Sequence, residues 1–143
     1  MQRKRRTTIL VNADLEFLAA FAAEVTRSVE VFTVMPAQAG LVMVRMRETA
    51  RESVFFPGEV LVTQAQVRIG STLGTGLIQG REPERALQLA ILDAAWNSGL
   101  ALVQTWTARL EAEEARQLQL RNEKARQIAR TLVDFQSLDQ EAV

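Results

Sequence analysis

Residues 55–69 read FFPGEVLVTQAQVRI and residues 72–81 read TLGTGLIQGR, with Gly70 and Ser71 between the two runs. Both runs are rich in β-branched residues, and a Gly-Ser dipeptide between two such runs predicts a β-hairpin. Successive side chains of a strand point to opposite faces, and the first run separates into apolar and polar residues by parity. The apolar set is Leu61, Ala65, Val67 and Ile69, and the polar set is Gln64, Gln66 and Arg68. We therefore expect the hairpin to bury one face and to expose the other.

Two further strands are predicted before the hairpin. Residues 29–35 are rich in β-branched residues, and the segment from Pro36 to Gly40 supplies a break that lets residues 41–47 run back. Residues 48–53 are polar and are predicted to form a loop. Because these connections are too short for crossovers, the four strands are predicted to form an antiparallel meander.

Two helices are predicted at the N-terminal end. Residues 7–11 form a short helix that continues from a basic run at residues 2–6. Asn12 is the predicted N-cap of a second helix, since Asp14 and Glu16 then lie in its first turn, where the helix dipole favours acids. The apolar residues at helical spacing in this helix are Leu15, Leu18, Ala22 and Val25. We expect this helix to pack on the sheet.

A third helix is predicted to begin near Pro83, because proline suits the first turn, where its missing N–H is not needed. This helix is apolar on more than one side, so we expect it to contact both the sheet and a second element. Gly99 is predicted to bend or divide it. Beyond Thr107 the sequence becomes polar, with a thin apolar seam of Leu110, Leu118, Ala125, Ile128 and Leu132. Such a seam is typical of a coiled-coil or partner-docking helix, and a helix folded against its own domain is the alternative.

Together these elements predict an α+β fold: a four-stranded antiparallel sheet with helices packed on one face and a long C-terminal helical extension. We expect residues 1–106 to form the core domain and residues 107–143 to form the extension, either docked to a partner or packed on the core. The chain has 143 residues, 48% of them hydrophobic, and a formal net charge of zero. That length and composition suit one globular domain.

The residue types that the chain lacks limit its chemistry. It contains no cysteine, no histidine and no tyrosine. Disulfides, thiolate or imidazole metal ligands, cysteine nucleophiles and histidine acid–base pairs are therefore excluded. The two lysines are Lys4 in the basic run and Lys124 in a charged helix. We expect no catalytic residue, no metal site and no cofactor in this chain.

Composition also bears on location and partners. No apolar run approaches the roughly 18 residues needed to span a bilayer, and the first residues lack the apolar region of a signal peptide. We therefore expect a cytoplasmic protein without membrane contact. The basic run at residues 2–6 is of a kind that can contact nucleic acid, but the neutral remainder of the chain favours a solvated tail. We expect no nucleic-acid partner.

Three glycines lie in the second run of the predicted hairpin. Gly74, Gly76 and Gly80 precede a predicted helix in an arrangement similar to a dinucleotide-binding fingerprint. The third glycine comes four residues after the second rather than three, and no parallel βαβ unit surrounds it. We therefore expect these glycines, with Gly58, to be structural, allowing another backbone to approach or a bulge to form.

Charged residues of the hairpin are candidate contacts. Arg68 and Arg81 lie at the ends of the two strands, and Arg81 also precedes a helix N-terminus, where anions are favoured. With Glu59, these residues are candidates to contact a phosphate, a phosphonate or a charged group of a partner subunit. The alternative is a surface charge, or an ion pair of an arginine with Glu59 or Glu82. Asp93 lies in an apolar helical run, where a lone carboxylate is expected to cap or bridge within the fold.

The central stretch resembles the PhnG subunit family of the bacterial carbon-phosphorus lyase system. The resemblance covers roughly residues 5 to 100 and rests on an ordered combination of motifs. These motifs are Phe-Phe-Pro-Gly-Glu-Val-Leu-Val-Thr from residue 55, Val67-Arg68, Gly74-Thr75-Gly76, Gly80-Arg81 and Leu-Ala-Ile-Leu-Asp-Ala from residue 89.

That resemblance implies an accessory subunit of the carbon-phosphorus lyase core complex, which acts on organophosphonates. In that family the subunit assembles with the other core subunits and takes part in the displacement of adenine from ATP by a phosphonate, which gives ribose 1-phosphonate 5-triphosphate. The resemblance thus implies a non-catalytic subunit of a multi-subunit transferase, inactive alone, which meets ATP and phosphonate only through the complex. The alternative is a stand-alone dimeric adaptor assembled through the C-terminal helix.

Overall fold

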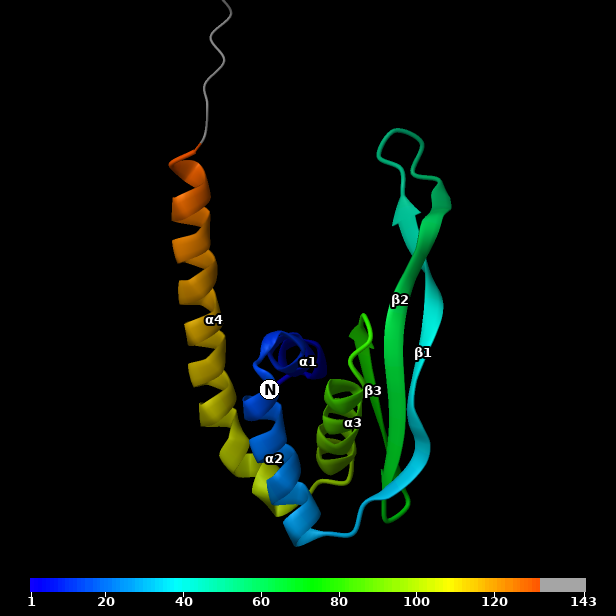
Figure 1. The fold of residues 1–143 in the computed structure, drawn as a ribbon, viewed down its shortest axis with the longest axis vertical. Helices are drawn as coiled ribbons and strands as arrows, with labels where there is room; N and C mark the ends of the chain where they lie inside the picture. Colours follow the sequence, from blue (N-terminus) through cyan, green and yellow to red (C-terminus); the bar gives the residue numbers. More distant parts are fainter. Residues whose placement is uncertain (132–143) are drawn as a thin grey trace, which may run out of the picture.

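The computed structural model describes residues 1–131, which form a three-stranded antiparallel sheet with helices on one face (Figure 1). The strands lie in the order β1-β2-β3. The elements in chain order are α1 (Arg3–Asn12), α2 (Leu15–Ser28), β1 (Phe32–Arg47), β2 (Val54–Ile69), β3 (Thr72–Gln79), α3 (Pro83–Asn97), a 3-10 turn (Ala101–Thr105) and α4 (Trp106–Ala129). The α+β class and the long C-terminal helix are confirmed.

The prediction of four strands is wrong, because β1 runs without interruption from Phe32 to Arg47. Pro36 and Gly40, which predicted a break, lie inside this strand. β1 is at the edge of the sheet, so the N–H that proline lacks is not needed on its open side. Register shifts on both sides of Met35 absorb the irregularity, so one bent strand forms instead of two.

The predicted hairpin is the β2–β3 pair, in which Ile69 pairs with Thr72 across a two-residue turn. Gly70 has a φ of +57°, which such a turn requires and glycine adopts without strain. The buried residues on the inner face of β2 include Ala65, Val67 and Ile69, as predicted. Leu61 departs from this pattern and is 37% exposed. β3 ends opposite Val62, and beyond that point β1 and β2 continue without a third strand.

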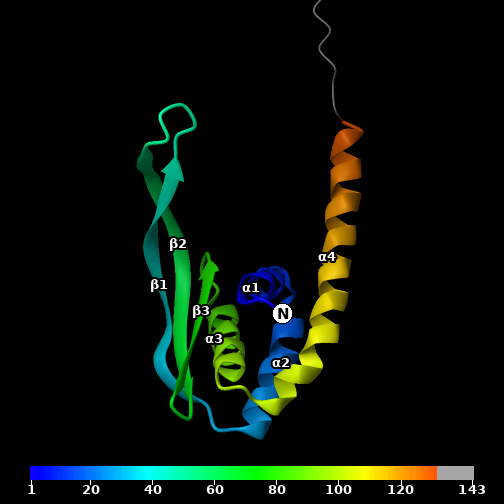
Figure 2. The same ribbon diagram turned by 180° about the vertical axis from the view of Figure 1, so that it is seen from behind.

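The hydrophobic core is centred on α3, which lies between the sheet and α2 (Figures 1 and 2). This position confirms that the apolar helix contacts the sheet and a second element. The expectation that the helix of residues 15–28 packs on the sheet is wrong, because α3 lies between α2 and the sheet. Trp106, at the start of α4, is fully buried, and its ring centroid lies 4.8 Å from those of Phe21 in α2 and Trp96 in α3. Edge-to-face aromatic pairs stabilise a fold beyond the effect of burying apolar surface. Through these two pairs, Trp106 attaches α4 to both α2 and α3.

The N-terminal basic run is not a solvated tail, because it forms the first turns of α1 and buries Arg6. The prediction that Asn12 caps the second helix is also wrong. Asn12 is the last residue of α1, and its Nδ2 donates to the Thr8 carbonyl at 2.7 Å. The backbone is extended at both Ala13 and Asp14, so α2 begins later, with Asp14 as its N-cap.

The C-terminal helix α4 has a packed half and a free half. Leu110 and Gln117 are buried, whereas Leu118 is 53% exposed and Ile128 is 61% exposed. The predicted apolar seam is therefore buried only at its start, and its last member, Leu132, lies outside the described residues. The domain boundary expected at residue 106 stays a prediction.

The connection between α3 and α4 contains Gly99, which divides the two helices as predicted. Its φ of +68° is one that glycine adopts readily. In the described part of the chain, no single helix is long and apolar enough to cross a membrane. Only α3 and the segment Ala101–Ala129 taken together reach that length and apolar composition, and the chain bends by 102° at the break between them.

Candidate functional site

Asp93 in α3 is the centre of a charged cluster that joins α1 to the sheet. Its carboxylate accepts hydrogen bonds from Arg3 Nη2 at 2.9 Å and from Arg6 Nη2 at 3.4 Å. It also accepts from the backbone N–H of Thr75 and from Asn97 Nδ2, each at 3.2 Å. Asp93 therefore bridges two helices and a strand, which is the kind of role that its place in an apolar helix predicts.

Arg6 is the buried partner in this cluster. Its guanidinium lies 4.3 Å from the centroid of the Trp96 ring, in a cation–π contact. Burial lowers the pKa of the Arg6 guanidinium from its ordinary value, and the Asp93 carboxylate opposes that shift. Because an arginine stays charged in a protein, Arg6 depends on Asp93 and Trp96 to replace the water that burial removes.

The same cluster protects the open edge of β3. This strand pairs only with β2, so its other edge faces α1 and α3 without a strand partner. The Thr75 N–H donates to Asp93, and the Leu73 carbonyl accepts from Asn97 Nδ2 at 3.1 Å. Unpaired strand edges promote aggregation, and two side chains of α3 here satisfy the edge groups that a further strand would otherwise bind.

A pocket of about 330 Å³ lies beside the cluster, between α1, α3 and β3. Its lining includes Arg3, Arg6, Thr75 and Asp93. Two guanidinium groups share one carboxylate, so the wall is positive overall and suits an anion better than a cation. Within residues 1–131, no group of His, Cys, Asp or Glu side chains is arranged to hold a metal ion.

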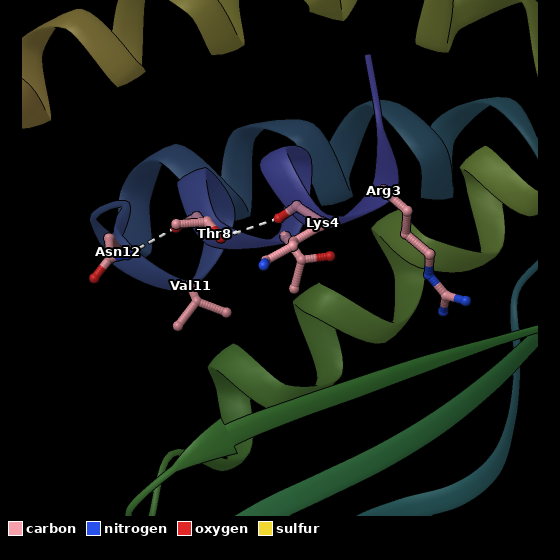
Figure 3. Close-up of a pocket in the computed structure, with 6 residues that line it drawn as sticks. Arg3, Lys4, Thr8, Val11 and Asn12 are labelled. Atoms are coloured by element: carbon pink, nitrogen blue, oxygen red, sulfur yellow. Dashed lines mark hydrogen bonds between the residues drawn. The ribbon is translucent and has the colours of Figure 1, made fainter. Parts of the chain in front are cut away.

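A second hollow, of about 520 Å³, follows the surface of α1 (Figure 3). All the residues that line it belong to this one helix. Thr8 Oγ1 donates to the Lys4 carbonyl at 3.0 Å and Asn12 Nδ2 donates to the Thr8 carbonyl, while Arg3 extends toward α3 (Figure 3). Because these polar groups bond to their own helix, the hollow lacks the convergent polar groups of a ligand site.

Replacing Asp93 with asparagine is expected to lower the free energy of unfolding by about 1–3 kcal/mol, because the buried Arg6 loses its charged partner. Asparagine keeps the side-chain shape and an oxygen that accepts from Thr75. The midpoint of urea unfolding measures the loss. Asp14→Asn is the matched control: Asp14 also pairs with an arginine, Arg116, but its side chain is 72% exposed. We expect Asp14→Asn to lower the free energy of unfolding by less than about 1 kcal/mol. If the two variants lost the same amount of stability, the role of Asp93 would be contradicted.

Polar contacts also fix the packed half of α4 to α1. Arg5 Nε donates to Glu114 Oε1 at 3.1 Å, across 109 residues of sequence. About one turn further along α4, Gln117 is buried and its Nε2 donates to the Ile9 carbonyl at 3.0 Å. One arginine and one backbone carbonyl of α1 therefore hold the C-terminal helix in place.

Two further carboxylates form ion pairs with arginines of α4, one from α2 and one within α4 itself. Glu24 in α2 accepts from Trp106 Nε1 at 2.8 Å and from Arg109 Nη1 at 2.6 Å. Burial opposes the charge on Glu24, but these hydrogen bonds hold the pKa of its carboxyl below the usual value. Glu113 accepts from Arg116 Nε at 2.7 Å, and this bond, against the opposing effect of burial, lowers the pKa of Glu113. Both groups are therefore ionised at neutral pH.

Comparison with known proteins identifies the family. The family profile described as "Phosphonate metabolism protein PhnG" matches residues 1–140. The chain belongs to the PhnG family. A curated relative from Rhizobium meliloti (strain 1021), named alpha-D-ribose 1-methylphosphonate 5-triphosphate synthase subunit PhnG, is 33% identical over 141 residues. The aligned part covers 94% of this chain and 86% of the relative. The resemblance of the central stretch is confirmed and extends over almost the whole sequence.

The predicted contact residues Arg68, Arg81 and Glu59 do not form one cluster in this PhnG family member. Arg68 lies next to the β2–β3 turn, where it donates to the Gly70 carbonyl and its guanidinium lies 5.0 Å from the centroid of the Phe32 ring. Arg81 follows the opposite end of β3, and both Arg81 and Glu59 are exposed. That these three residues contact an anion or a subunit stays a prediction.

Gly74 and Gly76 of β3 lie directly against α3. A Cβ on Gly76 would be 2.6 Å from the backbone nitrogen of Ala90, and a Cβ on Gly74 would be 2.5 Å from the Cβ of Ala94. Real Cβ atoms do not approach other atoms so closely, so a side chain at either position would push α3 away from the sheet. These two glycines set the distance between the helix layer and the sheet of the PhnG fold.

Gly58 and Gly80 have different surroundings, because a Cβ on either would meet nothing within 4 Å. Gly80 has a φ of +90°, which favours glycine strongly. Its N–H donates to the Leu61 carbonyl at 2.9 Å, and its carbonyl accepts from Thr63 Oγ1 at 2.6 Å. Gly80 therefore turns the chain from β3 toward α3, whereas Gly58 is free of close neighbours.

Sequence patterns do not predict that Arg3 and Arg6 meet Asp93, because 90 and 87 residues separate the partners. A usable signal is present in α1. Arg6 lies one turn before Ile9 and Leu10, so it shares their apolar helix face. An arginine on an apolar face indicates a buried charge that needs an acidic partner.

Proposed function

We propose that the chain is a non-catalytic subunit of a ribose 1-methylphosphonate 5-triphosphate synthase. In this reaction a phosphonate oxygen displaces adenine from the ribose of ATP, so that a C–O bond replaces the C–N bond to the base. The observation that carries the proposal is the match of residues 1–140 to the PhnG family, supported by a relative that bears the name of this synthase. The proposed partners are the other subunits of the carbon-phosphorus lyase core complex, in the cytoplasm.

The geometry supports a positioning role for this chain. Its most enclosed carboxylates, Asp93, Glu24 and Glu113, each accept hydrogen bonds from an arginine. A carboxylate held in such a pair is a weak general base, because the arginine stabilises its charged form. A subunit of this kind acts by holding the catalytic groups of its partners in register, where a misplacement of about 1 Å costs roughly a hundredfold in rate. ATP and phosphonate then meet this chain only through the complex.

Adenine release tests this proposal. The purified chain, mixed with ATP and methylphosphonate, is expected to release no adenine. The complete set of subunits is expected to release it, and omission of this chain is expected to lower the rate by about a hundredfold or more. Chromatography with detection of adenine measures the rate.

Two outcomes would contradict the proposal. Adenine release by the chain alone would make it catalytic rather than accessory. Full activity of the remaining subunits without it would remove this chain from the reaction. An Arg51→Lys chain, altered only in the exposed loop between β1 and β2, is the matched preparation control and is expected to restore the full rate.

A stand-alone dimeric adaptor assembled through α4 is the second candidate. The observation that favours it is the exposure of Leu118 and Ile128 on the free half of α4, which suits a paired helix. Light scattering of the purified chain separates the two candidates. A dimer that Ile128→Glu dissociates would favour the adaptor, and a monomer would favour the synthase subunit.

A further inference from the structure

The part of the β1–β2 pair that extends past β3 forms a long arm, made of residues 41–47 and 54–61. Its strands pair from Leu41–Leu61 to Arg47–Val54, whereas the pairing of β3 with β2 stops at Val62. Figures 1 and 2 show that this arm projects well past the helices of the core. No third strand or helix of the described residues covers it.

Exposed apolar side chains dominate this arm. Val42 pairs with Val60 and Val44 with Gly58 on one face, and beyond a register shift Met46 pairs with Phe55. The large exposed apolar residues of the arm are Leu41, Val42, Met43, Met46, Val54, Phe55, Phe56 and Leu61. An isolated two-stranded ribbon is marginally stable in water, and an apolar surface of this extent marks a binding face.

The free half of α4 forms a second arm of different character. Every residue from 118 to 131 is exposed. This segment carries Arg121, Lys124, Arg126 and Arg130 against Glu123 alone, a net charge of +3. Figures 1 and 2 show α4 and the β1–β2 arm extending past α1 toward the same end of the molecule. One apolar arm and one basic arm therefore stand on either side of α1.

We propose that the β1–β2 arm and the free half of α4 together hold one companion subunit, which presents an apolar surface to the strands and an acidic surface to the helix. This inference rests on the proposed function, since it assigns the companion to the same synthase. Beyond the proposed function, the inference names the surface through which the chain joins the complex and the chemical character of the partner that this surface recognises.

Charge complementarity favours a companion subunit over a second copy of this chain. The chain has a net charge of zero. Its more enclosed acids are already paired with its own arginines: Asp93 with Arg3 and Arg6, Glu24 with Arg109, Glu113 with Arg116 and Glu114 with Arg5. A second copy docked arm to arm would bring another segment of net charge +3 against this one, and like charges repel, whereas a different subunit is free to present an acidic surface to α4.

Aspartate substitutions on the strand arm test the apolar half of the surface. Leu41 is 63% exposed and Phe56 is 56% exposed, so Leu41→Asp and Phe56→Asp leave the core intact and are expected to keep the melting temperature of the chain. The expected result is at least about tenfold weaker binding to the co-expressed companion subunits, measured by surface plasmon resonance. Leu73→Asp is the matched control, because Leu73 is 51% exposed but lies on β3, outside the arm. Its binding is expected to stay within about twofold.

Charge reversal on α4 tests the basic half. The triple variant Lys124→Glu, Arg126→Glu, Arg130→Glu is expected to slow association by about tenfold and to remove most of its salt dependence. The charge-conserving triple variant Lys124→Arg, Arg126→Lys, Arg130→Lys is the control and is expected to associate at the wild-type rate.

The possible outcomes separate this inference from the proposed function. If the wild-type chain joins the companion subunits and both aspartate variants bind as tightly, the docking surface is wrong and the proposed function stands. If the wild-type chain does not join them, both are wrong. A dimer of the chain alone that Phe56→Asp dissociates would assign the arm to a second copy. Binding of nucleic acid that is lost only in the charge-reversal variant would assign α4 to another partner class.

Discussion

Replacing Gly76 with valine is expected to leave the chain without a cooperatively folded state, although valine favours strands intrinsically. The added Cβ would lie 2.6 Å from the backbone nitrogen of Ala90 and would also overlap the Ala86 carbonyl oxygen. Both atoms belong to the backbone of α3, which cannot rotate away as a side chain can. α3 is also held from its other side by α2, so it cannot retreat from the sheet without opening the core. We expect a loss of at least about 3 kcal/mol, at the upper end of overpacking effects.

Far-UV circular dichroism during urea unfolding measures this effect. Gly58→Val is the matched control, because it is the same substitution on a neighbouring strand, and its Cβ would meet nothing within 4 Å. We expect Gly58→Val to change the free energy of unfolding by less than about 1 kcal/mol. Gly76→Ala should lie between the two. If Gly76→Val unfolds at the wild-type urea concentration, the close contact between β3 and α3 is not a determinant of the fold.

Local sequence signals predict the elements whose causes are local. The Gly-Ser turn predicts the β2–β3 hairpin, Pro83 predicts the start of α3, and Gly99 predicts its end. The same reasoning fails at Pro36, because whether a proline interrupts a strand depends on its neighbours. β1 lies at the edge of the sheet and tolerates a missing N–H, which its own sequence does not reveal.

Long-range contacts account for the other errors and omissions. The run from Arg3 to Arg6 has the composition of a solvated tail, and only the fold brings Asp93 and Glu114 to it. The alternation of β2 predicts a buried face along its whole length, but Leu61 is exposed because β3 ends before reaching it. Charge partners and strand lengths are set by tertiary structure, so the candidate site around Asp93 could be predicted only in part.

Cutting the chain after Arg109 is expected to abolish cooperative unfolding, whereas cutting it after Gln119 is expected to leave the fold intact. The first cut removes Leu110, which is fully buried in the core cluster, together with the buried Gln117. Loss of a buried leucine side chain alone costs about 2–5 kcal/mol, which is a large part of the stability of a domain this size. The first cut also leaves Arg5 and the Ile9 carbonyl without their partners on α4.

Of the described residues, the second cut removes only 120–131, none of which belongs to the core cluster. Residues 120–131 are exposed throughout, so we expect a melting temperature within about 3 °C of that of the full chain, as for other exposed changes. Differential scanning calorimetry of both truncated chains measures the two transitions under identical conditions. A cooperative transition in the chain cut after Arg109 would instead support a domain boundary near residue 106. If the chain cut after Gln119 also lost its transition, the free half of α4 would be part of the folding unit rather than an arm available to a partner.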